Sequence, residues 1–459
     1  LAGTGGVASG PIPKMEMINS IGAKVMQGGS RRSAIYASLN WKHNDIPSFL
    51  TAKDWDKIPV GNTGLTLKQI KEQDFNFPAP LDMTNISINY DTEWLLNYWK
   101  TGNVGEVFLN NVKQALRSAE PGFSFNFMEN ENETLRNACT EVCSADDSDV
   151  CNLGSINFGR IESVTELASV VELGTKFLVC GTLRAQLPYK KVYAVREKNR
   201  RLGLGVMGLH EWLIKKGSNY EVSEELHRWL SIYRGVSDNT ARGFADQRSV
   251  SRPVAVRAVA PTGSIGILAG TTTGIEPLFA VAYKRRYLTN GTRWKYQYVV
   301  DSAAQELIDI YGVKPESIES ALDLAPDYER RIKFQADVQD YVDMSISSTI
   351  NLPEWGSKIN TSFCNLLPLY RTTRQLIDWE RNLKSMLRHT ISVISPLGEP
   401  VVRKKWIYPM SDIVDQGREG FRKNKKNPFH LSSDRFREWE RGYNKAYYEN
   451  LKRLGNTNE

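Results

Sequence analysis

The sequence predicts an α/β fold with a mostly parallel sheet. Short runs of β-branched and apolar residues alternate along the chain with longer stretches of helical period, which is typical of strands joined by helices. Of the 459 residues, 41% are hydrophobic and the mean hydropathy is −0.41, values that indicate a globular protein with a core. No apolar run reaches the ~20 residues of a membrane-spanning helix, so we expect no association with a membrane.

Each element has a local reason. Glycine ends helices, strands are rich in β-branched residues, and an acidic residue before a helix accepts hydrogen bonds from its first N–H groups. The expected elements of the first hundred residues are a glycine-rich start (1–13), a helix (14–26) ended by Gly28 and Gly29, a buried strand (33–39), the opening of a helix (45–52), a strand (84–90) and a helix capped by Asp91. Later elements are helices at 162–183 and 208–216 and short β-branched runs at 253–259 and 265–269.

Residues 137–151 are the most informative part of the chain, because they hold three of its five cysteines. Asn137, Cys139 and Glu141 alternate, so on an extended segment their side chains point to the same face. A carboxylate takes a proton from a hydroxyl, a thiol exchanges a hydrogen atom or an electron, and an amide holds an oxygen in place. The spacing therefore suits chemistry at one substrate carbon.

The cysteines of this stretch could also have a structural role, bind zinc or form disulfides. Cys139, Cys143 and Cys151 would then be buried small apolar side chains, as cysteines outside disulfides usually are. Zinc is excluded because the histidines are scattered and no second Cys/His pair lies at ligand spacing, so we expect no metal site. A disulfide framework is excluded because five cysteines in 459 residues indicate the reducing cytosol, which predicts a cytoplasmic protein. Redox or radical chemistry remains, or no chemistry at all.

Asn-x-Cys-x-Glu followed by Cys151-Asn-Leu-Gly-Ser-Ile-Asn157 resembles the catalytic segment of ribonucleotide reductase large chains, most of all the adenosylcobalamin-dependent and small phage-type members. Further matches follow in the family's order over roughly residues 1–355. They are Met26-Gln-Gly-Gly-Ser-Arg-Arg32, Asn85-Ile-Ser-Ile-Asn89, Asn199-Arg-Arg-Leu-Gly-Leu-Gly-Val-Met-Gly-Leu209, Ala260-Pro-Thr-Gly-Ser-Ile265 with Ala269-Gly-Thr-Thr-Thr-Gly-Ile-Glu-Pro277, and Ser348-Thr-Ile-Asn-Leu-Pro353.

The resemblance implies the ten-stranded α/β barrel of the ribonucleotide reductase and glycyl-radical type, with the cysteine-rich stretch as a catalytic finger loop in its centre. It also implies three parts: a barrel domain (1–356), a segment that departs from the family (357–402) and a basic helical tail (403–459). The barrel is expected to be N-terminally incomplete. The missing strands include the one that carries the redox partner of Cys151.

The implied reaction is the reduction of a ribonucleoside di- or triphosphate to the 2′-deoxyribonucleotide for DNA synthesis. Cys139 would be the thiyl radical that removes the 3′-hydrogen, Glu141 would deprotonate the 3′-hydroxyl, and Asn137 would hydrogen-bond the sugar. Cys151 would be one of two thiols that deliver the reducing equivalents and close into a disulfide. The cysteines outside the family pattern, expected to be structural, are Cys143, Cys180 and Cys364.

Pro261, Thr262, Gly263 and Ser264 lack the Gly-Lys-Ser/Thr of a Walker loop. An isolated tetrapeptide of this kind is usually a turn, although its hydroxyls and backbone N–H groups suit a phosphate in front of a helix N-terminus. The resemblance assigns the loop to the phosphates of the substrate.

Gly203-Leu-Gly205-Val-Met-Gly208 matches the dinucleotide fingerprint G-x-G-x-x-G. It follows a charged stretch, where the fingerprint requires a buried strand. We therefore expect these glycines to serve close helix packing and not a Rossmann fold.

The net charge of +7 favours an anionic partner, which a nucleotide or a nucleic acid would satisfy. Much of the basic excess follows Arg403. We interpret that tail as a solvated charged helix and not as a binding site.

The resemblance favours adenosylcobalamin as the radical source. The alternative is a class I reductase, in which this chain holds no cofactor and a separate metal-bearing subunit supplies the radical. Members of that class carry a tyrosine pair near the last barrel strand. Tyr447 and Tyr448 form a pair, but they lie in a polar helical pattern that indicates a surface helix.

The expected partners are a ribonucleotide, a nucleotide effector, a thioredoxin-like protein or a small dithiol as reductant, and the missing N-terminal segment as a separate chain. A function of another class also stays open: an inactive remnant that binds nucleotides without turnover. The missing partner of Cys151 favours the remnant. The intact Asn137, Cys139 and Glu141 favour the enzyme.

Overall fold

The computed structural model describes residues 6, 8–27, 31–74, 77–289, 293–351, 390–394 and 411–428, together with Trp439, Tyr443 and Ala446. The chain divides into two compact units. The first comprises Leu1–Val281 and Arg285–Gly398, and the second comprises Ala282–Lys284 and Glu399–Glu459. The candidate site lies in the first unit.

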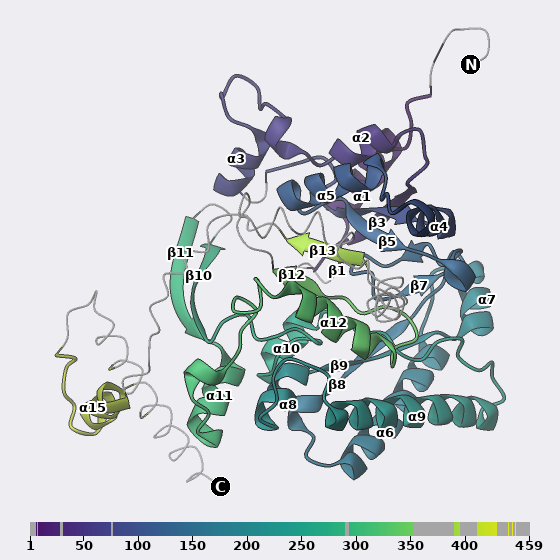
Figure 1. The fold of residues 1–459 in the computed structure, drawn as a ribbon. Coiled ribbons are helices and arrows are strands. Elements are labelled where there is room, and N and C mark those ends of the chain that lie inside the picture. The colour runs from purple at the N-terminus through teal and green to yellow at the C-terminus, as the bar shows by residue number, and fades with distance from the viewer. Residues whose placement is uncertain are drawn as a thin grey trace. The chain divides into compact units, whose positions relative to one another are not determined.

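One five-stranded sheet of the first unit has the order β12–β13–β5–β4–β3 (Figure 1). Its pairs are parallel except β13–β5, which is antiparallel. The predicted strand at 84–90 is confirmed as β4, whereas the strand predicted as buried at 33–39 is half-buried, because β3 is the edge strand. The strands are β3 (Ile35–Asn40), β4 (Thr84–Tyr90), β5 (Gly122–Phe125), β12 (Thr349–Asn351) and β13 (Thr390–Ile394).

Helices and an aromatic core stabilise this sheet. Asp91 accepts a hydrogen bond from the N–H of Trp94 and caps α4, as its position before the helix predicts. The ring of Tyr90 is buried against Trp94 and Phe108, and its hydroxyl accepts a hydrogen bond from Asn111. The helices of this region are α1 (Ile12–Lys24), α2 (Ile46–Thr51), α4 (Thr92–Thr101) and α5 (Glu106–Ser118).

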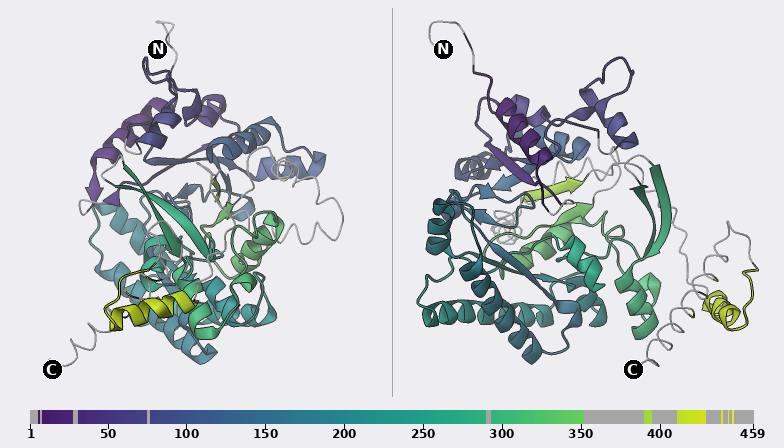
Figure 2. Two further views of the ribbon diagram at one scale, coloured as in Figure 1. Left: turned by 90° about the vertical axis from the view of Figure 1, so that its left-hand side faces the viewer. Right: turned by 180° about the vertical axis from the view of Figure 1, so that it is seen from behind.

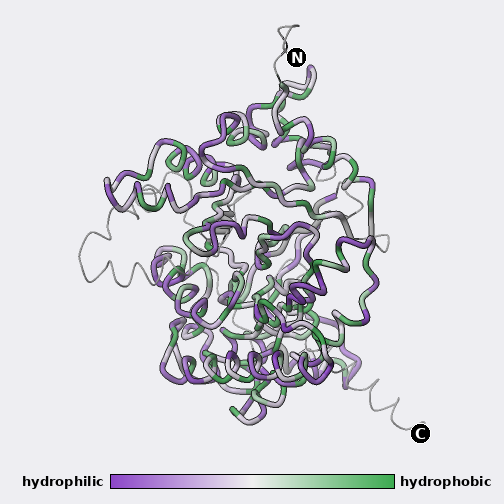
Figure 3. The backbone as a smooth tube through the Cα atoms, turned by 90° about the vertical axis from the view of Figure 1, so that its right-hand side faces the viewer, coloured by the Kyte–Doolittle hydropathy of each residue, from purple (hydrophilic) through white to green (hydrophobic). Residues whose placement is uncertain are grey.

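A second sheet begins with the parallel pair of β8 (Asn152–Asn157) and β9 (Leu202–Met207). Single β-bridges extend it from Leu204 to Arg257 and from Val259 to Ile346. The long helices α6 (Val164–Arg184) and α9 (Glu224–Gln247) pack together beneath it (Figure 2). Hydrophobic and hydrophilic residues alternate along the helices, as expected when one helix face is buried (Figure 3).

The segment at residues 344–351 belongs to both sheets. Ser345 and Ser347 exchange backbone hydrogen bonds with Val259 of the second sheet, at 3.1 and 2.9 Å. Thr349 then begins β12 of the first sheet. The first unit is thus built around two sheets that share one stretch of backbone.

Shorter elements complete the described chain. The motif at Met26 to Arg32 includes an antiparallel pair of β1 and β2, with residues 28–30 outside the described residues. The elements are β1 (Met26–Gln27), β2 (Arg31–Arg32), η1 (Trp55–Lys57), α3 (Leu67–Gln73), η2 (Met128–Asn130), β6 (Leu135–Arg136), β7 (Cys143–Ser144), η3 (Phe158–Arg160), α7 (Lys190–Asn199), α8 (Leu209–Lys215), α10 (Gly263–Ala269), β10 (Ala282–Thr289), β11 (Arg293–Val300), α11 (Ser302–Tyr311), η4 (Pro315–Ser317), α12 (Tyr328–Gln339) and α15 (Ser411–Arg422).

The structure corrects the secondary structure predicted for residues 265–269. Residues 265–269, expected as a β-branched run among strands, belong to α10. Thr262 and Gly270 flank this helix with left-handed backbone (φ 52° and 64°), so the apolar residues between them form one short helix and not an extended run. An apolar run this short does not distinguish strand from helix by its period.

The described residues test two expectations of the fold only in part. The described residues have mixed α/β content, but their strands form open sheets and no closed barrel. The predicted segment 357–402 is described only at residues 390–394, which form β13 inside the first sheet.

None of the helices that the structure describes is both long and apolar enough to cross a bilayer.

Candidate active site

The cysteine-rich stretch forms a hairpin. β6 and β7 pair antiparallel, with Arg136 opposite Cys143, and residues 137–142 form the connection. The N–H of Thr140 donates to the carbonyl of Asn137 at 3.0 Å, and Thr140 has a φ of 69°. The prediction of an extended segment with Asn137, Cys139 and Glu141 alternating on one face is therefore wrong, because the backbone reverses direction at Thr140.

Three contacts fix the tip of this hairpin. The side-chain amide of Asn85 on β4 donates to the carbonyl of Ala138 at 2.8 Å. The guanidinium of Arg136 donates to the Ser345 hydroxyl at 3.0 Å, and the N–H of Ser345 donates to the carbonyl of Glu141 at 2.9 Å. The first sheet and the shared segment thus hold the tip from both sides.

Although they are not on one strand face, the side chains of Asn137 and Glu141 do come together. Glu141 is 1% exposed, and its Oε2 has no hydrogen-bond partner within the described part of the chain. Burial raises the pKa of Glu141, against hydrogen bonds from its own backbone and from the Asn137 side chain. The Oδ1 of Asn137 accepts the N–H of Val142 at 3.1 Å. Cys139 is exposed at the turn, so an accessible cysteine lies two residues from a buried carboxylate.

Cys151 lies beside this hairpin, immediately before β8. It packs with Val142 against a small buried cluster that contains Cys143, Ala258 and Met344. Burial raises the pKa of the Cys151 thiol, Arg201 opposes the rise, and the charges of Asp149, Glu141 and Cys143 add to it. The predicted redox cysteine is therefore close enough to Glu141 to sense its charge.

The predicted phosphate loop leads directly into the N-terminus of α10. Thr262 is buried, and its hydroxyl accepts the N–H of Gly274 at 2.7 Å, so part of its role is structural. Gly263 and Ser264 are exposed in the first turn of α10. The loop follows Val259, which is hydrogen-bonded to Ser345, and Ser345 also binds Glu141. One backbone segment therefore links the loop to the hairpin.

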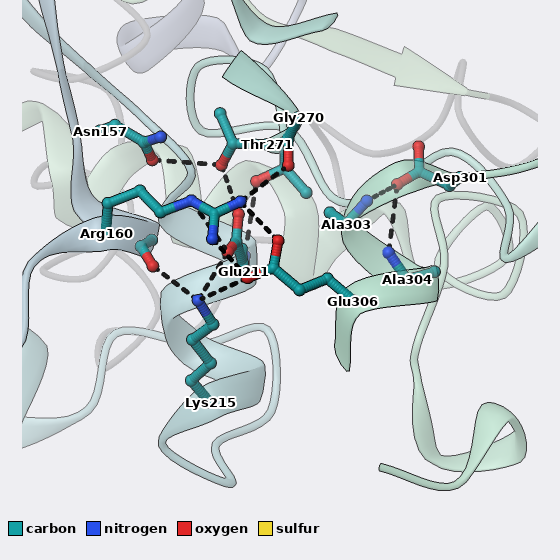
Figure 4. A network of polar contacts seen from close by, with 12 residues as sticks. Asn157, Arg160, Glu211, Lys215, Gly270, Thr271, Asp301, Ala303, Ala304 and Glu306 are labelled. Atoms are coloured by element: carbon teal, nitrogen blue, oxygen red, sulfur yellow. Dashed lines mark hydrogen bonds and ion pairs between the residues drawn. The ribbon is translucent and has the colours of Figure 1, made fainter. Parts of the chain in front are cut away.

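A buried network ties the far end of α10 to β8 (Figure 4). Glu211 is 1% exposed and accepts hydrogen bonds from Lys215 at 2.7 Å and from the Thr271 hydroxyl at 2.5 Å. That hydroxyl lies 3.2 Å from Oδ1 of Asn157, the last residue of β8. Arg160 donates to the carbonyl of Gly270 at 3.3 Å. The strand after Cys151 and the helix after the loop are thus held in one arrangement.

The glycines of the apparent dinucleotide fingerprint serve strand packing. Gly203 and Gly205 lie inside the fully buried strand β9. A Cβ on Gly205 would lie 2.5 Å from the carbonyl oxygen of Ala258. The expected close approach of backbones exists, but it joins neighbouring strands, so the prediction of helix packing is wrong.

The sequence matches the family model described as "Ribonucleotide reductase, barrel domain" over residues 1–70, 84–233 and 251–373. The chain belongs to the barrel-domain family of ribonucleotide reductases. It is 27% identical over 406 residues to the "Vitamin B12-dependent ribonucleoside-diphosphate reductase" of Mycobacterium tuberculosis (strain CDC 1551 / Oshkosh), which covers 77% of this chain and 57% of the relative. A Thermoplasma acidophilum protein of the same name is 26% identical, over 76% of this chain and 51% of the relative.

A relative from Mycobacterium phage D29, provisionally named as an adenosylcobalamin-dependent ribonucleoside-triphosphate reductase, is 27% identical over 61% of this chain and 40% of its own length. These relatives agree with the predicted resemblance to cobalamin-dependent and phage-type members. The chain spans about half the length of the curated relatives it matches.

Sequence reasoning missed the residues that position the site. Arg136 and Ser345 were not singled out, and Asn85 was noted only as part of a motif. A basic residue directly before the Asn-x-Cys-x-Glu pattern was the available signal for Arg136. Cys180 lies on α6 away from the pattern, whereas Cys364, Tyr447 and Tyr448 lie outside the described residues.

Proposed function

We propose that this chain carries the catalytic centre of a ribonucleotide reductase that converts ribonucleoside di- or triphosphates to 2′-deoxyribonucleotides by thiyl-radical chemistry. The observation that carries the proposal is the hairpin tip. It carries the exposed Cys139 two residues before the buried carboxylate of Glu141, in a chain of the reductase barrel family.

Each residue of the tip has a chemical part in the proposal. Cys139, as a thiyl radical, removes the 3′-hydrogen of the ribose. Glu141 accepts the proton of the 3′-hydroxyl, and its raised pKa strengthens it as a base while Oε2 remains available as the acceptor. Asn137 holds a sugar oxygen and orients the carboxylate.

Substrate phosphates bind at Pro261, Thr262, Gly263 and Ser264 in the proposal. The exposed first turn of α10 presents backbone N–H groups and the Ser264 hydroxyl, and these groups suit an anion. Cys151 supplies reducing equivalents, and a thioredoxin-like protein or a small dithiol restores its thiol.

Adenosylcobalamin is the radical source in this proposal. When bound, it supplies a radical that abstracts hydrogen. The exposure of the Cys139 sulfur fits this requirement, because the thiol must be reached by a group that the hairpin itself does not contain. The names of the relatives support cobalamin for this chain and do not favour the class I alternative.

The ten-stranded barrel belongs to the proposal as well. Among the described strands β8 pairs only with β9, so its other edge suits a further strand. An N-terminal segment, in the same polypeptide or as a separate chain, would supply that strand and close the barrel.

Turnover of ribonucleotides with adenosylcobalamin and a dithiol tests the proposal, for the chain alone and with the N-terminal segment of a relative supplied. Cys139→Ser should reduce product to background, because no other side chain can carry the radical at that position. Cys180→Ser, on α6, is the matched control and should retain activity. Activity above a trace in Cys139→Ser would contradict the assignment, and a folded wild type without turnover in both arrangements would favour the inactive remnant.

A further inference from the structure

The stretch at residues 274–278 is held by side chains from other parts of the fold. The N–H of Gly274 donates to the hydroxyl of Thr262, in the proposed phosphate loop, at 2.7 Å. The N–H of Leu278 donates to Nδ1 of the buried His210 at 2.9 Å. The stretch therefore has a fixed position relative to the loop.

Glu276, in the middle of this stretch, binds the backbone of the shared segment together with Arg331. Oε1 of Glu276 accepts the N–H of Thr349 at 2.6 Å, and the guanidinium of Arg331 donates to the carbonyl of Thr349 at 2.6 Å. The guanidinium also donates to Oε2 of Glu276 at 2.8 Å. Arg331 comes from α12, which packs beside β12 (Figure 1). One ion pair thus binds both backbone polar groups of Thr349.

This ion pair is largely removed from water. The side chains of Arg331 and Glu276 are 3% and 19% exposed, and Arg331 lies over the ring of Tyr220, 5.4 Å from its centroid. Burial raises the pKa of Glu276, and Arg331 and the N–H of Thr349 oppose the rise. Loss of either partner would leave a buried charge uncompensated, so the pair holds one geometry.

The backbone that the pair binds also holds the hairpin. Four residues before Thr349, the N–H of Ser345 donates to the carbonyl of Glu141 at 2.9 Å. Between them, the N–H of Ser347 donates to the carbonyl of Val259 at 2.9 Å. The hairpin and the ion pair are therefore bound to the same short length of chain.

We propose that Glu276 and Arg331 are positioning residues, whose ion pair fixes the hairpin tip at Glu141 relative to the proposed phosphate loop at residues 261–264. One side of the pair leads to the loop through residues 274–278, and the other side leads to the tip through the shared segment. The catalytic consequence rests on the proposed function. When the pair is broken, the loop still binds the nucleotide phosphates, but the ribose and the tip lose their alignment.

Arg331→Met tests the proposal, with Arg330→Met as its matched control. Arg330 is the adjacent residue on α12 and pairs with Glu319 in a more exposed position. The first measurement is hydrogen exchange of the full chain, resolved to single amides, and it needs no nucleotide. In Arg331→Met, the amides of Ser345 and Thr349 should exchange at least about tenfold faster than in wild type and in Arg330→Met, because local opening becomes easier.

Turnover and binding of CDP are the second measurement, with adenosylcobalamin and a dithiol in the turnover assay. The kcat of Arg331→Met should fall at least about tenfold, because a displacement of about 1 Å lowers rates by up to about a hundredfold. The dissociation constant for CDP, from calorimetric titration, should stay within about twofold, because the lost alignment acts only in the transition state. Both quantities should be unchanged in Arg330→Met.

Arg331→Lys decides the outcome if Arg331→Met fails to fold. Lysine keeps the charge beside Glu276, but its shorter side chain does not also reach the carbonyl of Thr349, so the same changes should appear at smaller size. Unchanged exchange at Ser345, an unchanged kcat or an equal loss of CDP affinity would overturn the proposal. A wild type without turnover would reject the proposed function alone, and the exchange at Ser345 would then decide on the ion pair.

Discussion

The side-chain amide of Asn85 donates a 2.8 Å hydrogen bond to the backbone carbonyl of Ala138, the residue directly before Cys139. Asn85 lies in β4, a central strand of the five-stranded sheet. The position of the exposed thiol is therefore set by a side chain more than fifty residues earlier in the chain.

We predict that Asn85→Ala lowers nucleotide reduction by at least about tenfold with little loss of fold. One hydrogen bond contributes about 0.5–1.5 kcal/mol to stability, whereas a displacement of a reacting group by about 1 Å lowers rates by up to about a hundredfold. Turnover rates and thermal unfolding measure the two effects. Asn132→Ala, at an exposed asparagine near the hairpin, is the control. Equal turnover of the two variants would show that Asn85 does not position the hairpin tip for the reaction.

The proposed phosphate loop at residues 261–264 gives a prediction that separates substrate binding from folding. Ser264→Ala should weaken the binding of a ribonucleoside diphosphate about tenfold or more, because a hydrogen bond to a charged group contributes about 1.5–3 kcal/mol. Thr262→Ala should instead lower the unfolding free energy, because the Thr262 hydroxyl accepts the N–H of Gly274. Calorimetric titration and denaturant unfolding measure these effects. Ser169→Ala on α6 is the control. An unchanged dissociation constant for Ser264→Ala would mean that the loop is a structural turn that does not bind phosphate.

Glu141 predicts a pH dependence of stability. Burial raises its pKa, so the folded protein holds the proton more tightly than the unfolded chain does. The cost of the buried charge is complete above the raised folded pKa and disappears as the pH falls below the usual glutamate value. Glu141→Gln should therefore raise the melting temperature relative to wild type more at pH 8 than at pH 4. The exposed Glu162→Gln should show no such difference, and a Glu141→Gln effect independent of pH would contradict the argument.

Gly208 and Gly217 both have a positive φ, but only Gly208 also lacks space for a side chain. Its φ is 71°, and an added Cβ would lie 2.2 Å from Oδ1 of Asn157 and 2.6 Å from Oγ1 of Thr271. Gly217 has a φ of 66° with nothing within 4 Å. Gly217→Ala should cost about 1–2 kcal/mol from backbone strain alone, and Gly208→Ala should cost about 1–3 kcal/mol more from overpacking. Denaturant unfolding measures both, and equal losses would mean that the network around Glu211 yields to the extra methyl group.

The elements that local patterns determine could be predicted from the sequence, and the site geometry could not. β4 and the cap at Asp91 follow from β-branched composition and from a carboxylate before a helix. The turn at Thr140 was missed because a threonine with positive φ has no local signal. It is stabilised by Arg136 and by Ser345, which lies more than two hundred residues away.

The glycines of β9 and the helix α10 were misjudged for related reasons. The close approach at Gly205 comes from Ala258, a residue that becomes a neighbour only through the bridges between Leu204 and Arg257 and between Val259 and Ile346. For α10, the left-handed residues at each end decide the helix, and the apolar run between them carries no period that separates helix from strand.

The shared segment at residues 344–351 has a mechanical consequence. Its backbone carries the bond to Glu141, the bridge to Val259 and, a few residues later, the pairing of β12. A load that pulls the two sheets apart therefore passes through the same few peptide groups that hold the backbone of Glu141. Separation of the two sheets at this segment would therefore also displace Glu141. A chain that has lost the contact between its sheets cannot keep the hairpin tip ordered.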